Sequence, residues 1–213
     1  QGVAPTVFMM SNPLPTPSRE QVERGVAVVT AEDNRWQRCD LKTISLLGNV
    51  LMRQLAADAG ALETIMFRNG NLTEASASNV LCVVRGTIVA PPKDNLILPG
   101  ITYDAALEFA RDAGLPMEIR PVSRAEALAA DELWLSSSTK EVLAITSVDG
   151  RPVGDGMPGP VFRKVWQLYQ QRHKIENLFG FMKHCRRVFA RFEKLARRYL
   201  AFVHLVAACI LLR

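Results

Sequence analysis

The chain of 213 residues contains only four cysteines, and they lie far apart in the sequence. Cys39, Cys82, Cys185 and Cys209 do not form the close pairs that structural zinc sites use. The three histidines, all beyond residue 172, show no ligand spacing either. The sequence therefore predicts no metal site, and its cysteines are typical of the reduced thiols of a cytoplasmic protein.

A membrane-spanning run and a signal peptide are also missing. The longest apolar stretch, residues 199–212, is interrupted by His204 and is shorter than the roughly 20 residues that a membrane span needs. We therefore expect a buried helix there and no membrane partner. The N-terminus has neither a basic start nor an initiator Met, so we expect the chain to begin inside a longer protein.

Charge is distributed unevenly. The number of Lys and Arg residues minus the number of Asp and Glu residues gives a net charge of 16 − 19 = −3 for residues 1–169. The same count gives 10 − 2 = +8 for residues 170–213. Such asymmetry marks a compositional boundary, and basic segments often bind nucleic acid. We expect a linker at residues 1–20, one globular domain at residues 21–168 and a basic helical tail at residues 169–213 that binds nucleic acid weakly.

Apolar periodicity and turn residues predict alternating strands and helices in the central domain, which is typical of the α/β class. Prolines make residues 4–20 an extended segment. The predicted strands are residues 25–34, 63–67, 80–84, 87–90, 95–98, 117–121, 132–136 and 142–147. The predicted helices are residues 44–59, 102–113 and 124–130, followed by a long helical pattern from residue 160 onward.

Two residues suggest a chemistry. Lys42 precedes a helix whose apolar residues could desolvate its amine, and burial lowers the pKa of a lysine. Glu74 opens a run of small residues, Glu-Ala-Ser-Ala-Ser-Asn, that would let backbone approach a planar ring. A pyridoxal phosphate enzyme needs both groups, a lysine that forms a Schiff base and a carboxylate that keeps the ring nitrogen protonated. Taken singly, Lys42 is far more typical of a solvated surface lysine, and Glu74 of an exposed glutamate in a loop.

Two further segments suit a phosphate group. Gly100, Ile101 and Thr102 begin a predicted helix, where free N–H groups and the helix dipole attract anions. Ser138 belongs to a run of hydroxyl side chains at the end of a predicted strand. An ordinary helix cap and a polar turn are the alternative interpretations.

In order and spacing, these segments resemble the large domain of class IV aminotransferases, most closely the D-amino acid aminotransferases, over residues 5–166. The resemblance implies a barrel-like α/β fold, a pyridoxal 5′-phosphate cofactor, a homodimer, and transamination between a D-amino acid such as D-alanine and a 2-oxo acid. It makes Lys42 the catalytic lysine. It gives cofactor-binding roles to Arg35, Lys42, Glu74, Ser78, Leu98, Ile101, Thr102 and Ser138. Ala77 stands where the family has a second serine in its Glu-x-Ser-Ser-Ser-Asn run.

Both ends of the chain depart from that family. Family members begin with a smaller domain that closes the active site, and we expect this chain to lack it. The tail resembles the C-terminal end of insertion-sequence transposases with a DDE active site, through Tyr169, Arg172, Glu176 and Lys183. There, Glu176 would be a relic of a metal site, since the aspartates that complete such a site are absent.

Three alternatives remain open from the sequence. The chain could belong to another branch of class IV, a branched-chain aminotransferase or an aminodeoxychorismate lyase. It could act as a DNA-binding transposase remnant through its tail. It could also be a non-functional fusion.

Overall fold

The computed structural model describes residues 16–171. Residues up to Phe162 form one compact unit, and a second unit begins at Arg163. The predicted linker lies mostly outside the described residues, as does nearly all of the predicted basic tail, including Glu176. Both stay predictions. Between residues 16 and 171, no helix combines the length and apolar character needed to cross a membrane.

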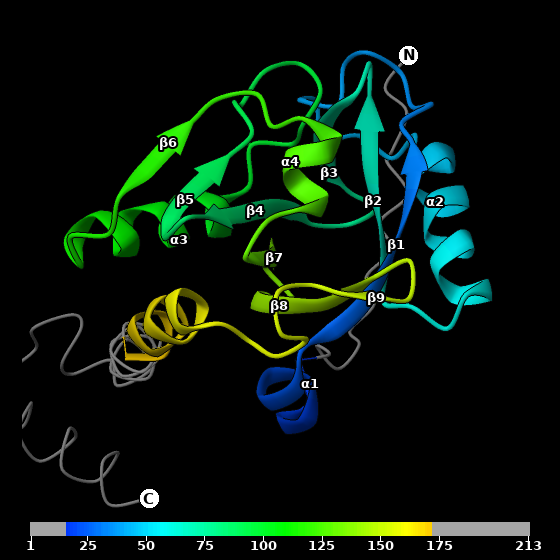
Figure 1. The fold of residues 1–213 in the computed structure, drawn as a ribbon. Helices are drawn as coiled ribbons and strands as arrows, with labels where there is room; N and C mark the ends of the chain where they lie inside the picture. The colour runs from blue at the N-terminus through cyan, green and yellow to red at the C-terminus, as the bar shows by residue number, and fades with distance from the viewer. Residues whose placement is uncertain (1–15, 172–213) are drawn as a thin grey trace, which may run out of the picture. The chain divides into compact units, whose positions relative to one another are not determined.

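A mixed sheet of nine strands forms the body of the domain (Figure 1). Its strands follow the order β3-β2-β1-β8-β7-β4-β5-β6, with β9 paired to β8. β1 runs parallel to β2 and to β8, and β5 runs parallel to β6, while the other pairs are antiparallel. The strands are β1 (Val26–Glu32), β2 (Glu63–Arg68), β3 (Asn71–Ala75), β4 (Asn79–Val84), β5 (Thr87–Ala90), β6 (Met117–Ile119), β7 (Glu132–Ser137), β8 (Glu141–Val148) and β9 (Arg151–Pro152).

The sheet curves until its two edges nearly meet. The backbone N–H of Leu72, in edge strand β3, donates to the carbonyl of Val122 at 2.8 Å. A bridge between Asn71 and Ser123 continues this contact. Since Val122 and Ser123 follow β6, the strand at the opposite edge, the sheet approaches closure, and the predicted barrel-like α/β fold is confirmed.

The hydrophobic core fills the inner face of this curved sheet. Alternate residues of the strands point to that face because side chains alternate along a strand. Core side chains from the strands include Val28, Ile65, Cys82, Leu133 and Ile145, and all are almost fully buried.

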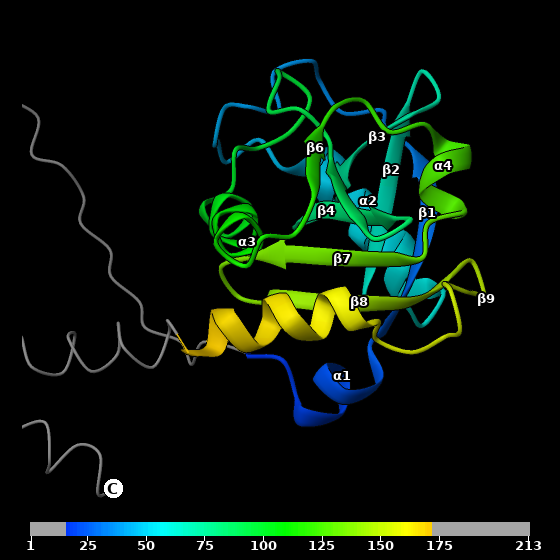
Figure 2. The ribbon, with the colours of Figure 1, turned by 60° about the vertical axis from the view of Figure 1, so that its left-hand side comes forward.

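Four helices flank the sheet (Figure 2). α2 (Leu47–Asp58) packs on β2 and β1, α3 (Ile101–Asp112) on β6, β7 and β8, α1 (Arg19–Arg24) on β8, and α4 (Arg124–Leu128) on β3. A further helix starts at residue 160 and continues through residue 171. The carboxylate of Glu132 caps its first turn by accepting from the N–H groups of Val161 and Phe162 at 2.9 and 2.8 Å.

Three local predictions were wrong. α1 overlaps the end of the predicted extended segment at Arg19 and Glu20, because Ser18 and Gln21 form a capping box that starts a helix. β3 was missed. Residues 95–98 form a turn instead of a strand, because the side chain of Asp94 accepts from the N–H of Leu96 at 2.8 Å.

The apolar side of α2 faces away from the sheet. Leu47, Val50, Leu51 and Leu55 recur at helical spacing and all four are exposed, while Met52 and Ala56 are buried. The hydroxyl of Thr64 in β2 donates to the carbonyl of Met52 at 2.6 Å, which holds the other side of the helix against the sheet. The apolar stripe of α2 therefore faces outward.

Candidate active site

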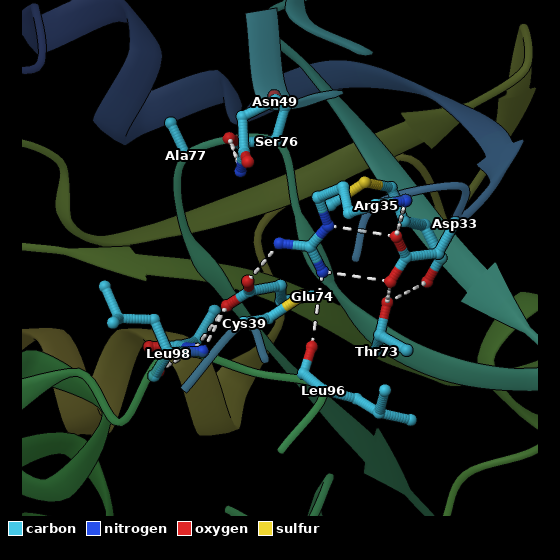
Figure 3. A network of polar contacts seen from close by, with 12 residues as sticks. Asp33, Arg35, Cys39, Asn49, Thr73, Glu74, Ser76, Ala77, Leu96 and Leu98 are labelled. Atoms are coloured by element: carbon cyan, nitrogen blue, oxygen red, sulfur yellow. Dashed lines mark hydrogen bonds and ion pairs between the residues drawn. The ribbon is translucent and has the colours of Figure 1, made fainter. Parts of the chain in front are cut away.

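Arg35 is the centre of a buried polar cluster just beyond the end of β1 (Figure 3). Its Nε and Nη2 each donate to the carboxylate of Asp33 at 2.9 Å. Its Nη1 donates to Oε1 of Glu74 at 2.5 Å, and only 4% of its side chain is exposed. One guanidinium thus joins the segment after β1 to the end of β3.

Asp33 supports this arginine from a fully buried position. It also accepts from the hydroxyl of Thr73 at 2.9 Å and pairs with Nη2 of Arg68 at 3.1 Å. Burial alone would raise the pKa of Asp33, but the hydrogen bonds and charge of Arg35 outweigh it, and the net effect lowers that pKa. Asp33 is therefore held as a carboxylate that keeps Arg35 in place.

Glu74 receives donors on both carboxylate oxygens. Oε1 binds Arg35, while Oε2 accepts from the N–H of Leu98 at 3.0 Å and from Nδ2 of Asn79 at 3.2 Å. Burial raises the pKa of Glu74, and the charge of Arg35 only partly offsets this effect. A cationic group close to this carboxylate, such as a protonated ring nitrogen, would favour its charged form.

Asn79, the first residue of β4, links Glu74 to the start of α3. Its Nδ2 also donates to the carbonyl of Leu98 at 2.8 Å, and its Oδ1 lies 2.3 Å from where a Cβ on Gly100 would be. Only glycine therefore fits at residue 100 with the backbone this close. Asn79 fixes the distance between the Glu74 carboxylate and the α3 N-terminus.

The N-terminus of α3 has no side-chain cap. The first N–H groups of a helix have no partner within it, so those of Ile101 and Thr102 suit a phosphate. The side chain of Ile101 is 87% exposed, and that of Thr102 is buried. Both residues therefore lie where the sequence predicted an anion site.

Serines with free or exposed hydroxyls lie at the end of β7, the strand paired with β4. Ser136 of β7 pairs in register with Asn79 of β4. Its hydroxyl is buried and lacks a hydrogen-bond partner among the described residues, which leaves a donor available near the α3 N-terminus. Ser138, the predicted phosphate hydroxyl, is exposed in the turn that follows β7.

Ser78 has a different partner in the structure. Its hydroxyl donates to Oε1 of Glu63 at 2.5 Å, and the hydroxyl of Ser76 donates to Oε2 at 3.1 Å. Both serines therefore hold the turn that connects Glu74 to Asn79. Glu63 was not singled out in the sequence, because it reads as one polar residue at the start of an apolar strand.

Lys42 lies on the loop between β1 and α2 and is exposed. Among the described residues, no hydrogen bond or ion pair joins it to the Arg35 cluster. The expected burial of its amine by the following helix is not observed, because the apolar residues of α2 point outward. An open recess of about 520 Å³ lies along the same loop and is lined by Arg35, Trp36 and residues 44–49.

The cluster also includes residues that the sequence analysis missed. Asp33 and Asn79 both contact predicted site residues, and Asn79 stands at the end of the small-residue run that drew attention to Glu74. Between residues 16 and 171, no group of three or more His, Cys, Asp and Glu could hold a metal ion. The free N–H groups at the start of α3 and the carboxylate of Glu74 instead suit an organic anion that carries a basic ring nitrogen.

The sequence profile of amino-transferase class IV matches residues 1–148. The chain belongs to this family, whose cofactor is pyridoxal 5′-phosphate, and the cofactor expected from the sequence is thereby confirmed.

Known D-alanine aminotransferases are the most informative relatives. That of Bacillus licheniformis is 41% identical over 169 residues, covering 79% of this chain and 59% of the relative. That of Listeria monocytogenes is 40% identical over 156 residues, covering 73% of this chain and 54% of the relative. The chain thus spans little more than half the length of these relatives.

Solved structures of the same fold include branched-chain amino acid aminotransferases. The PLP form from Thermobaculum terrenum superposes with a TM-score of 0.68 at 27% identity, covering 74% of this chain and 53% of that chain. The enzyme from Escherichia coli gives a TM-score of 0.64 at 30% identity, covering 70% of this chain and 52% of that chain. These structures share the fold of the class IV family to which the chain belongs.

Proposed function

We propose that this chain carries out the cofactor-dependent part of a transamination between D-alanine, or a similar D-amino acid, and a 2-oxo acid. The observation that carries the proposal is Glu74, a buried carboxylate held by Arg35, Asn79 and the N–H of Leu98. The D-alanine aminotransferase relatives support the choice of substrate.

The residues described above fit pyridoxal phosphate at both of its ends. Glu74 would accept a hydrogen bond from the protonated ring nitrogen. Arg35, held by Asp33, would fix the orientation of the Glu74 carboxylate. The N–H groups of Ile101 and Thr102, with the hydroxyls of Thr102 and Ser138, would hold the phosphate. Leu98 would pack near the ring. Ser78, through its hydrogen bond to Glu63, would hold the turn between Glu74 and Asn79 in place. When bound, the cofactor supplies an electron sink for the reaction at the substrate Cα.

Lys42 would bind the cofactor covalently and move a proton at the substrate Cα. Its loop starts beside Arg35 and returns to the open recess at residues 44–49, so both ends of the loop lie near the cluster. We infer that closure of this loop over the ring brings the amine into place.

Visible absorption tests the proposal. Addition of pyridoxal phosphate to the purified chain should give an absorption band that Lys42→Ala abolishes. Glu74→Gln should keep the band but weaken cofactor affinity. Lys93→Ala, at a surface lysine paired with Asp104, is the matched control and should behave as wild type. A band of equal strength in wild type and Lys42→Ala, or none in either, would reject the proposal.

A second class IV activity is separated from the first by a substrate screen. Several solved structures of this fold are branched-chain amino acid aminotransferases, which makes a branched-chain amino acid the alternative donor. A screen of D-alanine against L-leucine, L-valine and L-isoleucine with 2-oxoglutarate would separate the two. An aminodeoxychorismate lyase would instead act on its own substrate without an acceptor.

We also propose that the chain forms a homodimer. The support is the α2 apolar face, defined as Leu46, Leu47, Val50, Leu51 and Leu55, whose side chains are between 47% and 71% exposed. An exposed patch of this kind marks an interaction site.

Nucleic-acid binding by the basic tail stays a separate proposal, supported by its charge of 10 − 2 = +8 over residues 170–213. A transposase origin of that tail, and a cytoplasmic location, also stay predictions. DNA affinity that falls steeply with added salt and is unchanged by Lys42→Ala would favour this role. Broad, non-cooperative thermal unfolding would favour a non-functional fusion.

A further inference from the structure

A second buried carboxylate contacts the turn that follows Glu74. Glu63, the first residue of β2, has a fully buried side chain. Four donors surround it. Oε2 accepts from the hydroxyl of Ser76 at 3.1 Å and the N–H of Ala77 at 2.7 Å, and Oε1 accepts from the hydroxyl of Ser78 at 2.5 Å and Nζ of Lys140 at 2.8 Å.

The three neutral donors all belong to the turn between β3 and β4. That turn is closed by the N–H of Ala75, which donates to the carbonyl of Ser78 at 2.8 Å. Glu74 precedes the turn and Asn79 follows it. Any shift of the turn would therefore move the Glu74 carboxylate, which would hold the ring nitrogen of the cofactor, and the Asn79 amide, which fixes the start of α3.

Lys140 supplies the positive charge that this carboxylate needs. A buried carboxylate without a counter-charge is strongly disfavoured. The Lys140 side chain is 15% exposed and comes from the turn between β7 and β8, where its own N–H donates to the hydroxyl of Ser137 at 3.2 Å. Through Glu63, Lys140 therefore connects the turn that carries Ser138 with the turn that follows Glu74.

We propose that Lys140 is a positioning residue. Its ammonium balances the charge of Glu63, and Glu63 in turn holds the Ala75–Ser78 turn so that Glu74 and Asn79 keep their places at the two ends of the cofactor. This inference rests on the proposed function, since it assigns Lys140 and Glu63 to the same site.

Amide hydrogen exchange of the full chain without cofactor gives the first test. Lys140→Met should speed exchange at the Ala75 and Ala77 amides about tenfold, the scale on which loss of an outer support weakens a ligand site. Lys140→Arg, which keeps the charge, should change it much less. Lys93→Met removes an exposed ion pair and is the matched control. Unchanged exchange at the turn, or an equal increase throughout the sheet, overturns the proposal.

Titration with pyridoxal phosphate gives the second test. Lys140→Met should raise the Kd for the cofactor about tenfold, and Lys140→Arg should restore most of the affinity. If Lys140→Met does not fold, Glu63→Gln combined with Lys140→Met leaves no unbalanced buried charge and should show the same rise in Kd. An unchanged Kd beside a wild type that binds overturns the positioning role alone. A wild type that does not bind the cofactor overturns the proposed function and this role together.

Discussion

Arg35 balances two buried carboxylates, Asp33 and Glu74, with help from Arg68 at Asp33. A cluster of this kind contributes little net stability when complete, because desolvation of the charges offsets their attraction. Its members become costly only when one of them is removed. The cluster therefore serves geometry more than stability, and it sets the position of the Glu74 carboxylate.

Replacement of Arg35 tests that balance. Arg35→Met should lower the free energy of unfolding by about 3–5 kcal/mol, because it leaves buried carboxylates without their main partner. Arg38→Met is the matched control, since the Arg38–Asp40 pair lies at the surface and its loss should change the stability much less. Urea denaturation of the three proteins measures the difference. Similar losses in both variants would contradict the assignment.

Asp33 and Glu74 give the stability opposite dependences on pH. The pKa of Asp33 is lowered by folding, so Asp33 stabilises the protein above the unfolded value of about 3.9 and the contribution is lost as pH falls through the folded value. The pKa of Glu74 is raised by burial, so its contribution is present at low pH and is lost as pH rises through the folded value.

Asp33→Asn should therefore reduce stability at neutral pH and flatten the loss of stability that wild type shows below about pH 4. Urea midpoints measured from pH 3 to pH 7 give both quantities. An Asp33→Asn variant with the same acid-side slope as wild type would show that Asp33 does not carry this dependence.

The N-terminus of α3 shows how a helix and a strand together make a binding site. The uncapped start of the helix supplies N–H groups, and Asn79 at the start of β4 fixes where that start lies. Gly100 permits the contact because a Cβ would meet Oδ1 of Asn79 at 2.3 Å.

Gly100→Ala should destabilise the protein by about 1–3 kcal/mol through this overlap, and should weaken binding of pyridoxal phosphate. Gly60→Ala is the control, because an added Cβ there has nothing within 4 Å. It should cost only the strain of its positive φ and leave cofactor affinity unchanged. Calorimetry and cofactor titration measure the two effects. Equal Kd values for Gly100→Ala and wild type would argue against a phosphate site at α3.

The chain as a whole exposes apolar surface where a folded domain usually buries it. The α2 apolar face lies outside the sheet, next to the loop that carries Lys42. A second copy covering this face would bury both and would help exclude water from the active site. Association and cofactor binding would then be coupled through the loop between β1 and α2.

Leu51→Lys should weaken the proposed dimer by at least about tenfold in Kd, because it places a charge at the middle of the α2 apolar face. Leu128→Lys, at a leucine of α4 that is 47% exposed, is the control. Sedimentation velocity over a range of concentrations gives the association constants. A wild type that stays monomeric at high concentration would refute the dimer.

The sequence by itself determined the class of fold and the order of most strands and helices, and it proposed Lys42 and Glu74 as site residues. Apolar periodicity and turn residues act locally, and a resemblance in motif order needs no coordinates. For this reason β1, β5, β7 and α3 were predicted close to their observed bounds.

The contacts between distant segments had to come from the folded structure. Asp33, Glu63, Asn79 and Lys140 look like ordinary polar residues in the sequence, yet the fold brings them to Glu74 or to its turn. The outward orientation of the apolar side of α2 could not be predicted for the same reason, because periodicity shows that a helix has an apolar side and not which side the sheet covers. Such contacts depend on how the sheet curves and pairs over long sequence separations, and local patterns do not carry that information.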